Sequence, residues 1–327
     1  MRGSNILVVG GAGYVGSHMA KALASAGAGV VVVDDLSNGH ADAVTAELVT
    51  CDIADADALD TLLAARRFDA VMHFASSILV NESVVNPSLY YRNNVAATQV
   101  LLDAMVAHGI ERLVFSSSAA IFGEPLRVPI DEACPIRPIN PYGRTKAMVE
   151  QMLEDYDRAY GLRSVCLRYF NAAGADPAGD LGERHEPETH LIPLVLQAAA
   201  GRRESVSIFG TDYDTPDGTC LRDYVHVTDV CDAHRLALVR LMEGGASRHY
   251  NLGNGQGFSV REVIDTAQRV TGREIRVNHA PRRPGDPARL VANSSQARAE
   301  LGWVPQRSDL ETIVRDAWTW ERKFPWH

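Results

Sequence analysis

The fold of this chain is decided by the stretch Asn5-Ile6-Leu7-Val8-Val9-Gly10-Gly11-Ala12-Gly13-Tyr14-Val15-Gly16. The first five residues form an apolar run typical of a buried strand, and a segment of helical length extends from residue 14 to 26. The glycines between them match G-x-G-x-x-G. They permit a tight turn and let the backbone approach a pyrophosphate, which the N-terminus of the helix attracts. The stretch therefore predicts a dinucleotide-binding turn.

A second strand, residues 30–33, consists only of valines and ends at Asp34. Asp34 follows Gly10 by 24 residues, close to the roughly 20 expected for the acidic residue that binds the ribose hydroxyls. Asp35 comes next, and no arginine nearby is suited to a 2′-phosphate. This pattern favours NAD over NADP.

Strand-like and helix-like segments alternate through the first half of the chain. Further apolar runs cover residues 70–74, 112–115 and 164–169, and the helix candidates are 88–108 and 141–160. Strands separated by helices predict an α/β fold with a doubly wound parallel sheet. We therefore expect a dinucleotide-binding domain at residues 1–171, which also receives segments near 220–253.

The pattern changes after residue 171. Residues 172–190 are rich in Gly, Asp, Glu and Pro and predict a long loop. Beyond it, Ser259–Glu262 and Ser308–Glu311 both fit the capping box that begins a helix. We expect residues 172–327 to form a smaller, mixed α/β C-terminal lobe that binds the substrate.

Composition and charge exclude several classes of protein. The 327 residues carry a net charge of −9, which argues against nucleic-acid binding. No apolar run reaches the roughly 18 residues of a membrane span, and no signal peptide precedes the first strand, so we expect a cytoplasmic protein without a membrane partner. The odd count of five cysteines, without C-x-x-C, predicts free thiols.

No metal site is expected from the histidine pattern. The eleven histidines contain no H-E-x-x-H motif, and the nearest pair, His185 and His190, lies in the polar loop. We therefore expect these two loop histidines to be solvated.

Tyr142 and Lys146 are four residues apart on a predicted helix, so their side chains share one face. A phenol with a pKa near 10 is a poor base, but a nearby ammonium lowers that pKa. A shift of about three units corresponds to roughly 4 kcal/mol. Ser118 follows the apolar run 112–115, at a strand end where such sheets bind ligands. Strand-end serines also often cap backbone groups.

Ten short motifs, in their order along the chain, give it a specific family resemblance. It resembles the extended short-chain dehydrogenase/reductase superfamily, with its Rossmann-type NAD domain, and within it the UDP-glucose (UDP-galactose) 4-epimerase family. The residues that carry the resemblance are the Gly10–Gly16 loop, Asp52-Ile53, His73-Phe74-Ala75, Asn93-Asn94-Val95, Ser116–Ala119, Tyr142/Lys146, Arg168–Asn171, Gly218–Val227, Tyr250–Gly253 and Arg282–Asp286.

The resemblance implies a role for each matching residue. The catalytic residues would be Tyr142 as the general base, Lys146 and Ser118. The NAD-binding residues would be Gly10, Gly13, Tyr14, Val15, Gly16, Asp34, Asn38, Asp52, Ile53, Phe74, Ala75, Asn94, Ser116, Lys146 and Phe170. The UDP-sugar would contact Ser118, Tyr142, Asn171, Leu191, Arg222, Arg283, Asp286 and Leu290. The implied reaction is a reversible epimerisation at carbon 4 of a UDP-hexose through transient oxidation by tightly bound NAD.

Two positions depart from the family pattern or leave the substrate open. Ile78 stands where some relatives have a lysine near the NAD pyrophosphate. Leu290 stands where a bulky aromatic residue is typical of enzymes restricted to glucose and galactose, and a small residue of those that accept N-acetyl sugars. A UDP-N-acetylhexosamine, UDP-pentose or UDP-uronate 4-epimerase therefore remains an alternative.

Two further alternatives are disfavoured by the residues at the predicted site. A nucleotide-sugar dehydratase would carry an acidic residue just after the strand-end hydroxyl, where this chain has Ala119 and Ala120. A non-enzymatic NAD-binding protein would not need Tyr142, Lys146 and Ser118 together. Related proteins form dimers through long helices, so we expect a homodimer through residues 88–108 and 141–160.

Overall fold

A seven-stranded parallel sheet forms the centre of the larger lobe in the computed structural model, which describes residues 1–283 and 286–326. Its strands are β1 Asn5–Val9, β2 Gly29–Asp34, β3 Glu47–Thr50, β4 Ala70–His73, β5 Arg112–Ser118, β6 Arg163–Tyr169 and β11 Arg248–Leu252. Their order across the sheet is β11-β6-β5-β4-β1-β2-β3, and each pairing is parallel.

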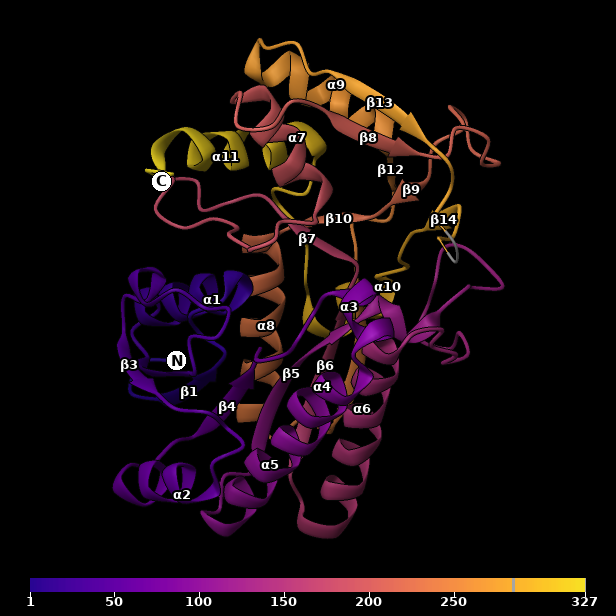
Figure 1. Ribbon diagram of the computed structural model, residues 1–327. Helices are drawn as coiled ribbons and strands as arrows, with labels where there is room; N and C mark the ends of the chain where they lie inside the picture. The colour runs from indigo at the N-terminus through magenta and orange to yellow at the C-terminus, as the bar shows by residue number, and fades with distance from the viewer. Residues whose placement is uncertain (284–285, 327) are drawn as a thin grey trace.

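Five helices cover this sheet: α1 Tyr14–Ser25, α2 Ala56–Ala65, α5 Ala97–Ala107, α6 Pro141–Tyr160 and α8 Val227–Met242. α1 and α8 contribute to the core on one face, and α2, α5 and α6 to the core on the other (Figure 1). The predicted fold class, a doubly wound α/β sheet, is confirmed.

Alternate residues of β1 enter the two cores. Ile6 and Val8 face α1 and α8, whereas Leu7 and Val9 face the opposite helices. All four side chains are fully buried, because a strand inside a parallel sheet has helices on both sides. This double burial explains why the first run in the sequence is apolar throughout instead of alternating.

The direction of the strand order reverses between β1 and β4. The chain first proceeds from β1 outward to β3, and then crosses to β4 on the other side of β1. Loops that leave the carboxyl ends of two such strands separate from each other, and ligands of doubly wound sheets bind in the crevice between them. Gly10 and Phe74 follow β1 and β4 directly and therefore mark this crevice.

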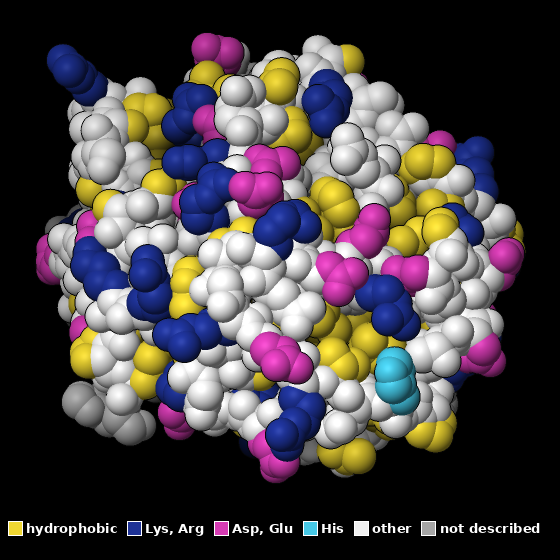
Figure 2. All heavy atoms as spheres, turned by 90° about the horizontal axis from the view of Figure 1, so that it is seen from above, with side chains coloured by type: hydrophobic (Ala, Val, Ile, Leu, Met, Phe, Trp, Pro, Cys, Tyr) yellow, Lys and Arg dark blue, Asp and Glu magenta, His cyan; other side chains and the backbone are white. Residues whose placement is uncertain are grey.

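The second lobe packs three helices around a core of its own: α7 Leu191–Ala199, α9 Val260–Thr271 and α11 Leu310–Lys323. Two strands pair in parallel beside them, β8 Val206–Phe209 and β13 Val277–Ala280. Figure 1 shows this lobe above the carboxyl ends of the large sheet. On the face seen from above, Lys and Arg side chains are interspersed with Asp and Glu (Figure 2).

The other elements that the structure describes are short: α3 Val80–Val85, α4 Pro87–Tyr90, α10 Ser295–Leu301, η1 Ala41–Ala43, η2 Tyr91–Ala96, η3 Ala119–Phe122, β7 Asn171–Ala173, β9 Leu221–Arg222, β10 Tyr224–His226, β12 Phe258–Ser259 and β14 Arg289–Leu290. β7 pairs with β10, and β9 pairs with both β12 and β14. Within the described residues, none of the helices combines the length and the apolar character that crossing a membrane requires.

Two local predictions need correction. The helix expected at residues 88–108 is divided into the end of α4, a π-helical turn at η2, and α5. The capping box at Ser259 is present, but α11 is capped by Asp309, whose carboxylate accepts from the Thr312 N–H. Ser308 instead donates to the buried carboxylate of Asp229 at 2.6 Å. Ser308 therefore bonds to Asp229, which is distant in sequence, and not to the first turn of α11.

Candidate active site

The glycine loop between β1 and α1 is shaped by backbone contacts. Gly10 has a φ of 76°, and a Cβ there would lie 2.3 Å from the backbone nitrogen of Ala75. A Cβ at Gly16 would lie 2.1 Å from the carbonyl oxygen of Gly10. Both glycines are therefore required by the close approach of the loop to its own helix and to the segment after β4.

The same loop is open at Gly13. A Cβ there would meet only the carbonyl oxygen of Gly10, at 3.5 Å. Gly13 is the N-cap residue of α1 and makes no side-chain hydrogen bond to the first turn, which begins with Tyr14 and Val15. Helix N–H groups and the positive end of the helix dipole attract an anion. This open, uncapped helix start fits the pyrophosphate of a dinucleotide.

Asp34 connects the end of β2 to the glycine loop. Its carboxylate accepts from the N–H of Ala12 at 2.9 Å and from that of Leu36 at 2.9 Å. Burial raises the pKa of Asp34, and these two hydrogen bonds oppose the rise. The carboxylate is thus held at the edge of the crevice, where its remaining acceptor capacity is available to ribose hydroxyls.

Three further residues that were predicted to bind the cofactor lie on loops after β2 and β3. Asn38 and Asp52 are exposed, while Ile53 is buried. Asp52 accepts from the N–H of Ala54 at 2.8 Å and so fixes the turn that leads into α2. These residues line the outer end of the carboxyl edge, beside β2 and β3.

The segment after β4 follows the carboxyl end of β1 closely. The N–H groups of Phe74 and Ala75 both donate to the carbonyl oxygen of Val9, at 2.7 and 3.2 Å. The Phe74 ring lies 4.8 Å from the ring of His234 on α8. Ile78, the departure from the family pattern, comes four residues after Phe74 and has 36 % of its surface exposed.

Asn94, on the π-helical turn η2, joins three segments of the site. Its Oδ1 accepts from the N–H of Ser77 at 2.8 Å, and its Nδ2 donates to the Ser77 carbonyl and to the Thr145 hydroxyl. Asn94 is almost fully buried. It therefore holds the segment after β4 against the first turn of α6, a positioning role that the sequence did not predict.

Lys146 and Tyr142 lie one turn apart on α6. The Nζ of Lys146 donates to the carbonyl oxygen of Ser116 at 2.8 Å, and it lies 5.9 Å from the centre of the Tyr142 ring. Lys146 has only 3 % of its surface exposed. Ser118, at the end of β5, is also buried and faces Tyr142. The structure thus brings the three predicted catalytic side chains together.

The protein does not by itself lower the pKa of Tyr142. Burial raises this pKa, and a hydrogen bond with Ser118 opposes the rise. Burial also lowers the pKa of Lys146 to about 7, against the charge of Glu150, which raises it. The sequence-based expectation rested on the attraction between ammonium and phenolate, helped by a positive nicotinamide. Desolvation of both groups is the larger effect in the folded chain.

A buried ion pair behind Lys146 was missed by the sequence analysis. Glu150 lies one turn further along α6, and its carboxylate accepts from Arg168 on β6 at 2.5 Å and from the Ser117 hydroxyl at 2.6 Å. Both charged side chains have 5 % or less of their surface exposed. The regular spacing of Tyr142, Lys146 and Glu150 was the available signal. The pair fixes α6 to β5 and β6 directly beneath the site.

Arg222 and Asp286, both predicted to contact the substrate, bind each other. Their side chains form an ion pair, and Arg222 also donates to the carbonyl oxygen of Pro287 at 2.9 Å. The Arg222 side chain is only 13 % exposed. The guanidinium is therefore held in a fixed orientation before any substrate arrives.

Asn171, Leu191 and Arg283 take different positions in the second lobe. The Nδ2 of Asn171 donates to the carbonyl oxygen of Asp223 at 3.0 Å, next to Arg222. Leu191 is the first residue of α7. The guanidinium of Arg283 lies 3.9 Å from the centre of the Phe209 ring, on the exposed surface of the lobe. The N–H of Asp286 donates to the carbonyl oxygen of Arg283 at 3.3 Å, so the backbone of Arg283 contacts a member of the Arg222 pair.

Leu290 connects the substrate lobe to the catalytic strand. β14 places it opposite Arg222 in the pairing with β9. Leu290 and Phe170 both pack against a small core that contains Ala119, directly after Ser118. The residue expected to influence sugar selection therefore belongs to the same packed group as the end of β5.

The loop histidines His185 and His190 were expected to be solvated, but the structure shows them in contact with carboxylates. His185 lies 3.3 Å from Glu183 and 3.5 Å from Glu188, and only 16 % of its side chain is exposed. The His190 Nδ1 bonds to Glu183 at 2.5 Å. Four residues separated by irregular chain converge here, which periodicity could not reveal.

Comparison with known proteins places this geometry in a family. Residues 6–253 match the family model for the NAD dependent epimerase/dehydratase family. The chain belongs to this family. A curated UDP-glucose 4-epimerase of Azospirillum brasilense is 55 % identical over 319 residues, which cover 97 % of this chain and 92 % of the relative.

Two solved structures in this family are similar over nearly their whole length. The UDP-glucose 4-epimerase of Brucella ovis in complex with NAD has a TM-score of 0.95 and 52 % identity, with 96 % of this chain and 97 % of that one covered. The UDP-glucose-4-epimerase of Stenotrophomonas maltophila, with bound NAD and formylated UDP-arabinopyranose, has a TM-score of 0.94 and 41 % identity, with 98 % of each chain covered.

Proposed function

We propose that this NAD-dependent enzyme interconverts UDP-glucose and UDP-galactose by epimerisation at carbon 4. The observation that carries the proposal is the convergence of Tyr142, Lys146 and Ser118 beside a glycine loop whose helix start is open to a pyrophosphate. The similarity to UDP-glucose 4-epimerases over nearly the whole chain supports this substrate over an N-acetylhexosamine, a pentose or a uronate.

The cofactor supplies the chemistry that side chains lack, the reversible acceptance of a hydride, and its oxidised nicotinamide adds a positive charge to the site. The residues that would hold it are those of the glycine loop, Asp34 and the segment from Phe74. Asp34 offers acceptors to ribose hydroxyls, and the α1 N-terminus offers donors to phosphate. Among these residues, Gly13 leaves the open space that such a ligand needs.

Tyr142 takes the proton of the sugar 4-hydroxyl and returns it after the 4-keto sugar has turned over in the site. Burial works against the phenolate, so Lys146 and Ser118 have to stabilise it. Glu150 favours the charged form of Lys146 and so assists this step from behind. The proton taken by Tyr142 and the hydride that NAD would accept both have to return to the sugar, and this makes the overall reaction a pure isomerisation.

Arg222 and Asn171 hold the UDP portion while the sugar turns. Arg222 is already oriented by Asp286 and the Pro287 carbonyl, so little side-chain entropy is lost when it binds a diphosphate. Leu290 packs beside the catalytic strand end and limits the space around the sugar. Leu191 and Arg283 complete the proposed binding surface of the second lobe.

The proposed reaction is tested by incubating the purified enzyme with UDP-galactose, without added NAD, and measuring UDP-glucose. We expect conversion by protein that retains its own NAD. Tyr142→Phe should retain NAD and lose nearly all turnover. Tyr160→Phe, on the exposed end of the same helix, is the matched control and should leave turnover unchanged. Protein that holds NAD but converts only UDP-N-acetylglucosamine or UDP-xylose would reject the hexose assignment.

We also propose a cytoplasmic homodimer that is formed through residues 88–108 and 141–160, with the boundary between cofactor and substrate parts near residue 171. Met148, on the outer surface of α6, is 39 % exposed, and Val84 on the neighbouring α3 is 61 % exposed. These apolar side chains support burial against a second copy. Light scattering of Met148→Lys should show a shift towards monomer.

A further inference from the structure

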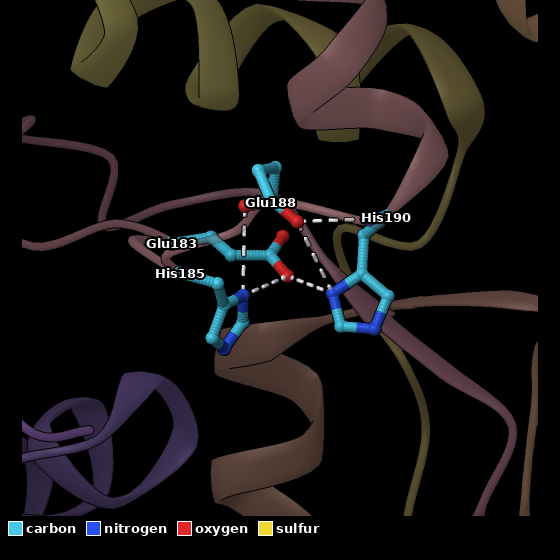
Figure 3. A group of neighbouring side chains, drawn as sticks. All are labelled: Glu183, His185, Glu188 and His190. Carbon is cyan, nitrogen blue, oxygen red and sulfur yellow. Dashed lines mark hydrogen bonds and ion pairs between the residues drawn. The ribbon is translucent and has the colours of Figure 1, made fainter. Parts of the chain in front are cut away.

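Four side chains of the loop between β7 and α7 converge on one point. They belong to Glu183, His185, Glu188 and His190, and one nitrogen or oxygen atom from each lies within 4.8 Å of all the others. Figure 3 shows both imidazole rings turning a nitrogen towards the two carboxylates. In the part of the chain that the structure describes, this is the one group of His, Cys, Asp or Glu side chains with such convergence.

The convergence leaves one polar atom without a hydrogen-bond partner. The Nδ1 of His185 is buried and makes no hydrogen bond, although oxygens of Glu183 and Glu188 lie 3.3 and 3.5 Å away. Both contacts are ion pairs without hydrogen-bond geometry, whereas a buried polar atom normally makes a hydrogen bond. The atom points at the carboxylates from a distance suited to a shared ligand between them.

We propose that these four residues bind one Zn²⁺ ion as a structural site. Two imidazole nitrogens and two carboxylate oxygens are ligands that Zn²⁺ accepts in its preferred tetrahedral arrangement. Two carboxylates balance the charge of the ion when both histidines are neutral. With four ligands from the protein, no position remains for a reacting water, so the site holds the loop and performs no chemistry.

The spacing of the ligand atoms suits such an ion. Zinc–ligand bonds of about 2.0–2.1 Å in a tetrahedron separate neighbouring ligand atoms by about 3.3–3.4 Å. The Nδ1 of His185 lies 3.3 Å from Oε1 of Glu183 and 3.5 Å from Oε2 of Glu188, and the Nδ1 of His190 lies 3.7 Å from the other oxygen of Glu188. The Glu183–His190 pair, at 2.5 Å, has to open when its shared proton leaves, and the other separations lie within 4.8 Å. Small side-chain rotations therefore complete the coordination.

Neighbouring groups already orient the proposed ligands. A Glu188 oxygen accepts from the N–H groups of Thr189 and His190 at 2.7 and 2.8 Å. The backbone carbonyl of Glu183 accepts from the indole N–H of Trp320 on α11. Such supporting hydrogen bonds fix ligand direction in metal sites. The His190 side chain is 48 % exposed and gives the ion a path from solvent.

The site would fasten the loop to both lobes. Arg184, between two proposed ligands, forms an ion pair with Asp42 of the dinucleotide lobe at 2.6 Å. Leu191, directly after His190, begins α7 on the substrate side. An ion at this point therefore fixes the approach of the substrate lobe to the cofactor loops. This inference does not rest on the proposed reaction, since binding is measurable without turnover.

A cluster of two protonated histidines and two carboxylates is the competing explanation. This protonated cluster has the same net charge as the zinc-bound cluster but binds no ion. The two explanations therefore differ in the metal content of the protein and in the number of protons on the histidines. Zn²⁺ binding has to displace the protons of the imidazoles, and proton release upon binding is measurable by calorimetry in buffers of different ionisation enthalpy.

The experiment uses the full chain with its own NAD, freed of metal by a chelator and dialysis. We expect calorimetric titration with ZnCl₂ to show one ion per chain with proton release, and elemental analysis after gel filtration to recover that ion. His185→Gln/His190→Gln should weaken binding by about 100-fold or more, since even loss of supporting partners costs 10- to 100-fold. Glu188→Gln preserves the size of the side chain and an oxygen that accepts from the two backbone N–H groups, so it tests the ligand role if the double variant does not fold.

His108→Gln is the matched control. His108 also pairs with a carboxylate, that of Asp60 at 2.8 Å, but outside the cluster, and this variant should bind Zn²⁺ like the parent chain. The proposal is overturned if the parent chain retains no zinc after gel filtration. It is equally overturned if folded Glu188→Gln and the double variant bind zinc as tightly as the parent chain does.

Discussion

Gly10→Ala should damage the enzyme far more than an ordinary glycine substitution. A Cβ at Gly10 would lie 2.3 Å from the nitrogen and 2.6 Å from the Cα of Ala75, and the left-handed φ of 76° adds strain. These atoms are backbone and cannot rotate aside. The segment is also bound to β1, since the Phe74 N–H donates to the Val9 carbonyl at 2.7 Å.

The loss of stability expected for Gly10→Ala has two parts. A left-handed conformation costs an alanine about 1–2 kcal/mol. The Ala75 backbone has to withdraw by about 0.7 Å to restore even the 3.0 Å that Cβ contacts essentially never fall below, and overpacking of this kind costs about 1–3 kcal/mol. We therefore expect a loss of about 2–5 kcal/mol, together with displacement of the loop that faces the cofactor.

The assay separates these two parts with a second glycine. Gly109 has a similar φ of 68°, but a Cβ there would meet nothing within 4 Å, so Gly109→Ala should lose only the conformational part. Urea unfolding gives the stability of both variants, and absorbance after gel filtration gives their bound NAD. If Gly10→Ala matches Gly109→Ala in stability and keeps its NAD, our reading of the loop is wrong.

Three further predictions concern the ion pair, pH and the substrate. Arg168→Met should lower the free energy of unfolding in urea by about 3–5 kcal/mol, because Glu150 is left charged and buried, and Arg168→Met/Glu150→Leu should recover most of this loss. If the single and the double variant have the same free energy of unfolding, the proposed energetic role of the ion pair is contradicted. Thermal stability should fall from about pH 6.5 towards pH 4, since the unfolded chain takes up protons that buried histidines refuse. These histidines are His18, His73 and His234, and burial is the chief cause that lowers their pKa values to about 4, 3 and 4. A thermal stability that does not change over this pH range would refute the assignment. Arg222→Gln should raise the KM for UDP-galactose about 10- to 100-fold with a smaller change in kcat, and an unchanged KM would remove its proposed role.

Periodicity and the glycine pattern were sufficient for the fold class of the first lobe, but not for every strand of its sheet. The continuous burial of Ile6 to Val9 is what a central parallel strand requires, so the apolar run identified it. β3, Glu47–Thr50, was missed because it is an edge strand of four residues with no fully buried side chain. An edge strand needs few apolar residues, so it leaves a weak signal.

The site was predictable where it depends on local spacing and unpredictable where it depends on tertiary contacts. Tyr142 and Lys146 share a helix, and their common face follows from four-residue spacing. The desolvation that sets the pKa of both groups comes from neighbours distant in sequence. Likewise, Arg222 and Asp286 are 64 positions apart, so no local sequence pattern predicts that they pair.

The last strand of the large sheet has a consequence for how the chain is made. β11 reaches β6 only after residue 252 has left the ribosome, and α8, which covers one face of the sheet, is synthesised shortly before it. Until then the edge of β6 has no pairing strand, and the sheet face that α1 and α8 share is covered only in part, by α1. Open strand edges and apolar faces promote aggregation. A fragment that stops at residue 171 would therefore contain every glycine of the cofactor loop and still be an unfinished domain.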